Sequence, residues 1–181
     1  MDEQKENNYT LSVFAEDKIG LVNKLTIVFT RRKINIVSLT TSESENKGVF
    51  RFTIVLKTTR DMMEKVTKQV EKLIGVLKAF FYEDDQVIYQ ELALYKIPTE
   101  ALFGGTTIEH IIREHYARII TVEKEFVIIE KTGHERETTE LFEKLQPYGV
   151  IGFVRSGRVA LPKPMKKVMS YIEDIENNTH Y

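Results

Sequence analysis

The first eighty residues carry the apolar patterns expected of strands and amphipathic helices. Strands are predicted over residues 9–15 and 34–42, and residues 21–32 between them have helical spacing. The apolar stripe of this first helix consists of Leu21, Leu25, Val28 and Phe29. These positions recur at i, i+4, i+7 and i+8 and therefore form one face, which we expect to cover a sheet.

The next stretch predicts a half-buried strand, a capped helix and a further strand. Apolar residues alternate through residues 49–56, and the inward set is Phe50, Phe52, Ile54 and Leu56. Thr58 and Asp61 resemble a capping box that starts a helix. The residues expected on its inner face are Met62, Val66, Val70, Leu73 and Leu77. A strand over residues 76–82 completes the order β-α-β-β-α-β, the split βαβ arrangement.

The same order returns in the second half of the chain. The expected elements are strands over residues 89–97, 118–122, 126–130 and 150–155, with helices near residues 107–116 and 136–145. We therefore predict an α+β protein made of two ferredoxin-like βαββαβ domains in tandem. The expected boundaries are a disordered N-terminus over 1–8, domains over 9–83 and 89–161, a linker over 84–88, and a tail with a short helix over 162–181.

Composition narrows the classes of function. The chain has 26 Lys and Arg against 27 Asp and Glu, so its net charge of −1 gives no reason to expect nucleic acid or an anionic membrane. It has no cysteine, which excludes disulfides and thiolate chemistry. The polar, acidic start does not resemble a signal peptide, and no apolar run is long enough to span a membrane. We expect a cytoplasmic protein.

Residues with catalytic or metal-binding patterns are scarce. His110 and His115 are five apart, whereas helical zinc pairs use i, i+4 spacing. The run Gly104-Gly105-Thr106-Thr107 lacks the lysine of a phosphate-binding loop, so we interpret it as a turn that leads into a helix. We expect no catalytic residue and no metal site in this chain.

One stretch invites comparison with RNA-binding domains. Residues 47–52 lie on the third strand of a βαββαβ unit, where those domains carry stacking aromatics on the open sheet face. Here the required positions hold Val49 and Arg51, while Phe50 and Phe52 are one residue out of register and are expected to face the core. The pattern therefore disfavours RNA binding.

The turn between the first strand and the first helix is a candidate for ligand binding. Gly20 stands where the strand turns into the helix, and a glycine there leaves room above the free N–H groups of the helix N-terminus. Asn35 opens the next strand. If helix start and strand start lie at one end of the sheet, Asp17, Gly20 and Asn35 face one small polar molecule. Alternatively, Asp17 is a helix cap, Gly20 a turn glycine and Asn35 a residue in left-handed geometry.

These residues carry a resemblance to a known family. Residues 17–21 (DKIGL) and 35–39 (NIVSL) are similar to the ACT domain, a βαββαβ module that senses amino acids. Four later motifs, at residues 91–97, 117–122, 130–133 and 154–157, extend the resemblance to the regulatory small subunit of acetolactate synthase. The chain is similar to that family from Tyr9 to Leu161.

The resemblance implies a non-catalytic subunit that dimerises through its first, ACT domain. It implies that a branched-chain amino acid, usually valine, binds at the dimer interface, and that the chain activates a large catalytic subunit and transmits feedback inhibition. Thiamine diphosphate, magnesium and FAD are expected in that partner and no cofactor in this chain. The effector-binding positions carried over are Asp17, Ile19, Gly20, Leu21, Asn35 and Ile36.

Some features leave alternatives open. The family often has asparagine where this chain has Asp17, and proline or serine where it has Ile19. An ACT-type sensor for another biosynthetic enzyme or a transcription regulator is one alternative, and an RNA-binding module is another. Residues 155–158 and the tail are the candidate surface for the catalytic subunit.

Overall fold

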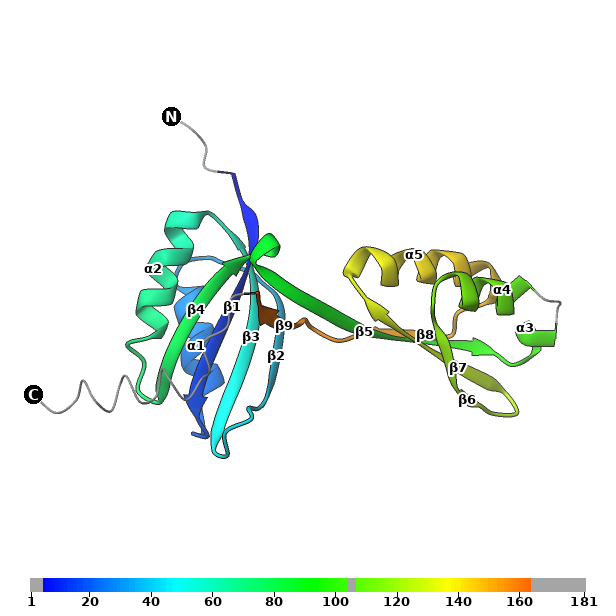
Figure 1. Ribbon diagram of the computed structural model, residues 1–181, viewed down its shortest axis with the longest axis horizontal. Coiled ribbons are helices and arrows are strands. Elements are labelled where there is room, and N and C mark those ends of the chain that lie inside the picture. The colour runs from blue at the N-terminus through cyan, green and yellow to red at the C-terminus, as the bar shows by residue number, and fades with distance from the viewer. Residues whose placement is uncertain (1–4, 104–106, 164–181) are drawn as a thin grey trace, which may run out of the picture. The chain divides into compact units, whose positions relative to one another are not determined.

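The computed structural model describes residues 5–103 and 107–163, and these fall into two compact units. Of the described residues, unit 1 contains 5–88 and 158–163, and unit 2 contains 89–103 and 107–157. Figure 1 shows helices and a sheet in each. The helix expected in the tail lies outside the described residues. Within those residues, no helix is long and apolar enough to cross a membrane.

Unit 1 has the predicted βαββαβ order (Figure 1). Its elements are β1 (Asn7–Glu16), α1 (Leu21–Thr30), β2 (Ile36–Glu43), β3 (Val49–Thr58), α2 (Arg60–Val70), β4 (Val76–Glu83) and a 3-10 helix (Asp84–Gln86), joined later by β9 (Val159–Pro162). The sheet order is β2-β3-β1-β4, and every pairing among these strands is antiparallel. This is a ferredoxin-like sheet with its first and third strands in the centre.

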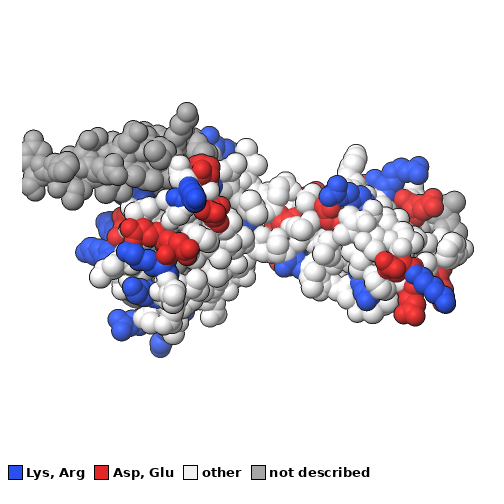
Figure 2. Space-filling model, turned by 90° about the horizontal axis from the view of Figure 1, so that it is seen from below, with Lys and Arg blue, Asp and Glu red and all other residues white. Residues whose placement is uncertain are grey.

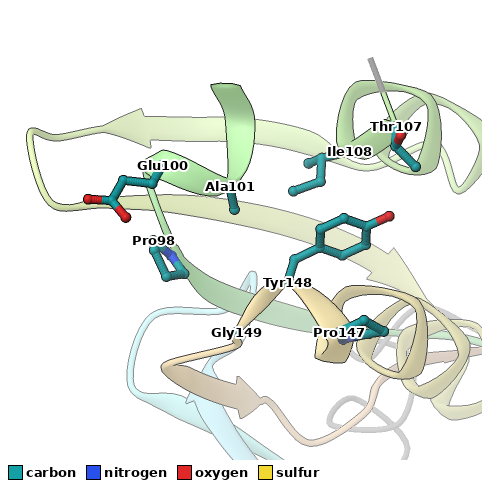
Figure 3. Close-up of a pocket in the computed structure, with 8 residues that line it drawn as sticks. All are labelled: Pro98, Glu100, Ala101, Thr107, Ile108, Pro147, Tyr148 and Gly149. Carbon is teal, nitrogen blue, oxygen red and sulfur yellow. The ribbon is translucent and has the colours of Figure 1, made fainter. Parts of the chain in front are cut away.

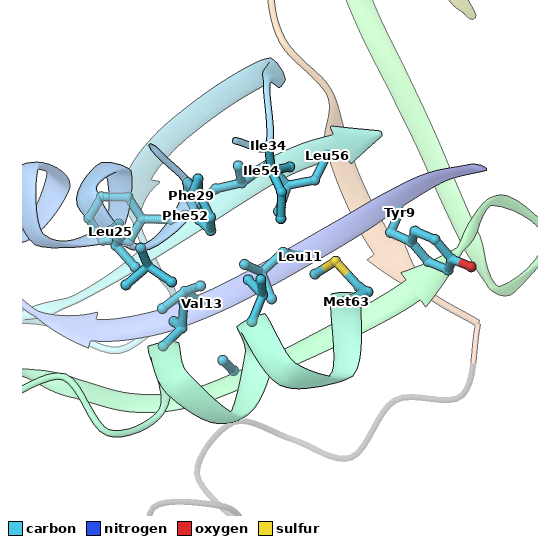
Figure 4. Packing of buried hydrophobic residues seen from close by; sticks show 14 of the residues in the cluster. Tyr9, Leu11, Val13, Leu25, Phe29, Ile34, Phe52, Ile54, Leu56 and Met63 are labelled. Atoms are coloured by element: carbon cyan, nitrogen blue, oxygen red, sulfur yellow. The ribbon is translucent and has the colours of Figure 1, made fainter. Parts of the chain in front are cut away.

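The core of unit 1 lies between the sheet and its two helices (Figure 4). Leu11 from β1, Phe29 from α1 and Met63 from α2 are fully or almost fully buried there. Phe52 lies in this core and Phe50 packs against it, so the expected register of β3 is confirmed and the aromatic platform of an RNA-binding sheet is absent from this strand. Each large apolar side chain buried in this way contributes roughly 1.5–3 kcal/mol.

The second helix differs from its prediction by one residue. Thr59, not Thr58, is the N-cap, and its hydroxyl accepts a hydrogen bond from the Met62 N–H at 3.4 Å. Val66 and Val70 are fully buried as expected, and Met63 is buried with them, while Met62 packs partly buried against the same core. The helix ends at Val70, so Leu73 and Leu77 lie beyond it, although Leu73 still packs against the core.

Unit 2 repeats the fold. It contains β5 (Val87–Pro98), whose first two residues belong to unit 1, α3 (Glu100–Phe103), α4 (Thr107–Glu114), β6 (Arg118–Val122), β7 (Phe126–Gly133), α5 (Glu135–Leu145), a 3-10 helix (Gln146–Tyr148) and β8 (Gly152–Arg155). The strand order β6-β7-β5-β8 matches that of unit 1. Tyr95 is fully buried in its core, and the Tyr95 hydroxyl donates to the Thr138 carbonyl at 2.6 Å. The tandem ferredoxin-like fold predicted from the sequence is confirmed.

Three expected boundaries differ from the structure. Asn7 and Asn8, expected in a disordered N-terminus, are the first residues of β1. The expected linker at residues 84–88 is a 3-10 helix followed by the start of β5. Residues 158–161, expected in the second domain, belong to unit 1, where Arg158 Nη1 donates to Asp84 Oδ1 at 2.6 Å.

Candidate functional site

The N-terminus of α1 is the least capped helix start in unit 1. Its N-cap is Gly20, in the left-handed region at φ 83°, and no side chain caps the helix. The first turn contains no acidic residue, whereas α2 has the Thr59 cap and Asp61 in its first turn. The first N–H groups of a helix need acceptors and carry partial positive charge. The start of α1 is therefore suited to an external carboxylate.

Backbone hydrogen bonds hold the loop that leads to this helix. The Asp17 N–H donates to the Gly48 carbonyl at 3.3 Å, and the Glu16 N–H donates to the Gly75 carbonyl at 2.9 Å. Asp17 does not cap the helix, since the N-cap is Gly20. A Cβ added to Gly20 would meet no atom within 4 Å. The backbone at this point is therefore held by hydrogen bonds, and the space beside Gly20 is open.

Asn35 lies at the other end of the sheet from Gly20. Glu16, at the end of β1, is opposite Val49 on β3, whereas Ile36 is opposite Leu56. Those partners are seven positions apart on β3, which corresponds to about 23 Å along an extended strand. The expectation that one chain brings Asp17, Gly20 and Asn35 to one end of the sheet is wrong. The physical reason is that α1 runs back along the sheet before β2 begins.

The apolar residues among the expected effector-binding positions include one buried and two exposed side chains. Leu21 is 3% exposed and belongs to the core, so its side chain does not line an open site. Ile19 is fully exposed beside Gly20, and Ile36 is exposed at the start of β2. Val37, which the sequence analysis did not single out, is also exposed. Two consecutive exposed apolar residues at a strand start are the signal that could have drawn attention to this edge.

Strand β2 forms one edge of the sheet in unit 1. Among the strands that the structure describes, it pairs with β3 alone. An edge strand presents unpaired N–H and C=O groups that can pair with another chain. Ile36 and Val37 add exposed apolar side chains at the start of this edge, and the rest of the strand is mostly polar.

Unit 2 contains a pocket of about 580 Å³ (Figure 3). Its lining residues are Pro98, Glu100, Ala101, Thr107, Ile108, Pro147, Tyr148 and Gly149. Apolar and proline side chains dominate its lining. Over the described residues, no three His, Cys, Asp or Glu side chains are grouped to hold a metal ion.

The arginines expected to meet a partner have structural roles. Arg155 forms ion pairs with Glu91 at 3.4 Å and with Glu135 at 3.1 Å. Arg158 is 5% exposed and forms its ion pair with Asp84 within unit 1. Figure 2 shows positive and negative side chains interspersed on the face in view, rather than a basic surface suited to nucleic acid.

Comparisons with known proteins agree with this fold. A family model described as the AHAS small subunit-like ACT domain matches residues 11–78, and one described as the small subunit of acetolactate synthase matches residues 90–164. The chain is 36% identical over 155 residues to the acetolactate synthase small subunit of Mycolicibacterium smegmatis, covering 86% of this chain and 91% of that one. It is 32% identical over 148 residues to the Bacillus subtilis small subunit, covering 81% and 86%.

A solved structure gives the same result. The acetolactate synthase small subunit of Thermotoga maritima superposes with a TM-score of 0.79 at 28% identity, covering 88% of this chain and 99% of that one. The fold and the family matches define a class of proteins in which an ACT domain is followed by a second ferredoxin-like domain. Within that class, the chain belongs to the acetolactate synthase small subunit family.

Proposed function

We propose that this chain is the regulatory, non-catalytic subunit of an acetolactate synthase in branched-chain amino acid biosynthesis. The relatives that it matches over most of their length are named as small subunits of that enzyme. In this proposal, a large catalytic subunit binds thiamine diphosphate, magnesium and FAD and performs the reaction. The present chain activates that subunit and transmits feedback inhibition by valine or a related amino acid.

One observation carries the proposed effector site: Gly20 and Asn35 lie at opposite ends of the sheet in one chain. A single chain therefore cannot use both on one small molecule. If two copies pair through their β2 edges in antiparallel fashion, the start of one β2 meets the end of the other. Asn35 of one copy then approaches the end of the sheet where Gly20 of the other copy lies. The unpaired β2 edge, with Ile36 and Val37 exposed at its start, supports this homodimer.

The chemistry of the two ends suits an amino acid. The uncapped N–H groups at the start of α1 suit a carboxylate, and the side-chain carbonyl of Asn35 suits an ammonium group. Ile19 and Ile36 are exposed apolar side chains that can contact an aliphatic chain. Together they favour a branched-chain amino acid over a charged one.

Inhibition follows if the amino acid binds one arrangement of the subunits better than another. A ligand shifts a conformational equilibrium only by its difference in affinity for the two states. An effector held between two copies would respond to any change in how those copies are placed. Binding there would therefore bias the arrangement that the catalytic subunit senses.

Reconstitution tests the proposal. The chain is mixed with the catalytic subunit from the same organism, and acetolactate formation is measured with and without valine, leucine or isoleucine. We expect activation by the wild-type chain, inhibition by at least one of these amino acids, and activation without inhibition by Gly20→Asp. The matched control is Gly149→Asp, because Gly149 is also a left-handed glycine but lies in unit 2. Failure to activate, or full inhibition of the Gly20→Asp enzyme, would refute the proposal.

A further inference from the structure

Unit 1 contains a second cavity, of about 240 Å³, away from the start of α1. It is lined by Thr40, Ser42, Glu43, Ser44, Glu45, Arg51, Thr53, Val159, Ala160 and Leu161. These residues come from β2, the turn after it, β3 and β9. All of them belong to unit 1, so the cavity is formed within one compact body.

The register places the polar lining on the face of the sheet opposite the helices. Thr40 is opposite Thr53, which is opposite Ser12 on β1. In β3, Phe52 and Ile54 flank Thr53 and lie in the helix-covered core. Because side chains alternate along a strand, the three hydroxyl residues share the other face. A row of hydroxyl groups therefore runs across this face next to β9.

Arg51 lies on the same face and reaches β9. Its Nη2 donates to the Ala160 carbonyl at 3.0 Å, and its Nε donates to Ser12 Oγ at 3.3 Å. The guanidinium carbon is 5.2 Å from the centre of the Phe14 ring. No acceptor for Nη1 is found among the residues that the structure describes. Partial burial lowers the pKa of Arg51, but its ordinary pKa is so high that the group stays charged.

Two further features indicate that the cavity is suited to a polar guest. Thr40 Oγ1 is buried and has no hydrogen-bond partner in the described part of the chain, which is costly for a hydroxyl. Glu45 stands at the rim, and its charge acts on Arg51. Glu43 is opposite Phe50 on the helix-covered face, and one of its oxygens accepts the Gly48 N–H at 3.1 Å. The site thus holds a cation, hydroxyls and one carboxylate close together. This carboxylate would repel a phosphate, whereas a zwitterion meets both signs of charge.

We propose that this cavity binds a free amino acid, with its carboxylate on Arg51 and the threonine hydroxyls and its ammonium group on Glu45. The volume of about 240 Å³ suits a molecule of this size. This site is distinct from the one proposed between two copies and uses none of its residues. An amino acid bound here would contact both the sheet and β9, and would therefore stabilise the attachment of β9 to unit 1.

Thermal unfolding of Gly20→Asp tests this inference, because that variant removes the other proposed site. Each of the common amino acids, and inorganic phosphate in a separate arm, is titrated against the full chain. We expect at least one amino acid to raise the melting temperature in a concentration-dependent way. Adding Thr40→Val, which replaces the hydroxyl with a methyl group of similar shape, should weaken apparent affinity about tenfold. Arg51→Lys, which keeps the charge but loses the planar fork, should weaken it as well.

The exposed Thr132→Val in unit 2 is the control and should leave the affinity unchanged. Each variant is compared with its own melting temperature without ligand, so any loss of stability does not mask the result. No amino acid effect in Gly20→Asp, equal affinity after Thr40→Val, or tighter binding of phosphate would overturn the inference. A chain that carries only Thr40→Val keeps Gly20 and therefore keeps the other proposed site. Failure of this inference is thus separable from failure of the proposed regulatory function.

Discussion

Arg158 Nη1 donates to Asp84 Oδ1 at 2.6 Å, and this ion pair joins the segment after β8 to the 3-10 helix after β4. The Arg158 side chain is only 6% exposed, whereas that of Asp84 is 45% exposed. Arg158 also approaches Thr10 Oγ1 at 3.5 Å. The contact holds residues 158–163 within unit 1 although 74 positions separate the two partners in sequence.

Asp84→Ala should lower the stability of unit 1. The substitution removes a charge-assisted hydrogen bond from an almost buried guanidinium, for which a cost of about 1.5–3 kcal/mol is typical. Chemical unfolding monitored by circular dichroism measures the loss. Asp85→Ala, at the exposed neighbouring position, is the control. Equal stability of the two variants would show that the ion pair contributes nothing.

Gly20→Asp should fold. Its Cβ meets no atom within 4 Å, so the cost is that of a side chain at φ 83°. This cost is about 1 kcal/mol, and aspartate is among the residues that tolerate the left-handed region best. We expect a fall in melting temperature of about 2–4 °C. Loss of the cooperative transition would contradict the open surroundings of Gly20.

Tyr95→Phe should destabilise unit 2 without a change in fold. The Tyr95 hydroxyl is buried and donates to the Thr138 carbonyl at 2.6 Å. Its loss should cost about 1–2 kcal/mol, measured by urea unfolding. Burial also raises the pKa of Tyr95, so this phenol should remain protonated when exposed tyrosines ionise at alkaline pH. Tyr116→Phe, at a 91% exposed position, is the control and should cost nothing measurable.

Glu137 should give α5 a pH-dependent contribution to stability. The His134 N–H donates to Glu137 Oε2 at 2.7 Å, and this hydrogen bond is the main reason that the pKa of Glu137 is lowered. A lowered folded-state pKa means stability that is fully present above the unfolded pKa and lost as the pH falls through the folded pKa. The advantage of wild type over Glu137→Gln should therefore shrink between about pH 5 and about pH 3. Urea unfolding at each pH measures it, with the exposed Glu143→Gln as the control. A difference that does not vary with pH would contradict the assignment.

Local patterns in the sequence predicted most elements because alternation and helical spacing are local properties. The register of β3 followed from its alternating phenylalanines, which lie on the core side as expected. The cap of α2 shifted by one residue because Thr58 and Thr59 are both acceptable N-caps, and only the folded backbone selects between them. The sequence patterns thus predicted which helices and strands exist better than they predicted where each one ends.

Contacts between residues far apart in the sequence could not be predicted from local patterns. The return of residues 158–161 to unit 1 depends on Arg158 meeting Asp84, and nothing local marks those two as partners. The separation of Gly20 and Asn35 was different, because the direction of α1 against the sheet was available from the element order. Following the chain along β1, back along α1 and into β2 would have placed these residues at opposite ends.

Mixed dimers test most directly whether the effector site is shared between two copies. Gly20→Asp and Asn35→Ala chains carrying different tags are purified as homodimers and as the mixed dimer. Valine, leucine and isoleucine binding are then measured by isothermal titration calorimetry. In the mixed dimer, one site carries both substitutions and the other carries neither.

We expect that neither homodimer binds the effector and that the mixed dimer recovers half of the sites of the wild-type dimer, with wild-type affinity. A site made by one chain would have a defect in both copies of the mixed dimer. Absence of binding by the mixed dimer, while the wild-type dimer binds, would therefore contradict the shared site.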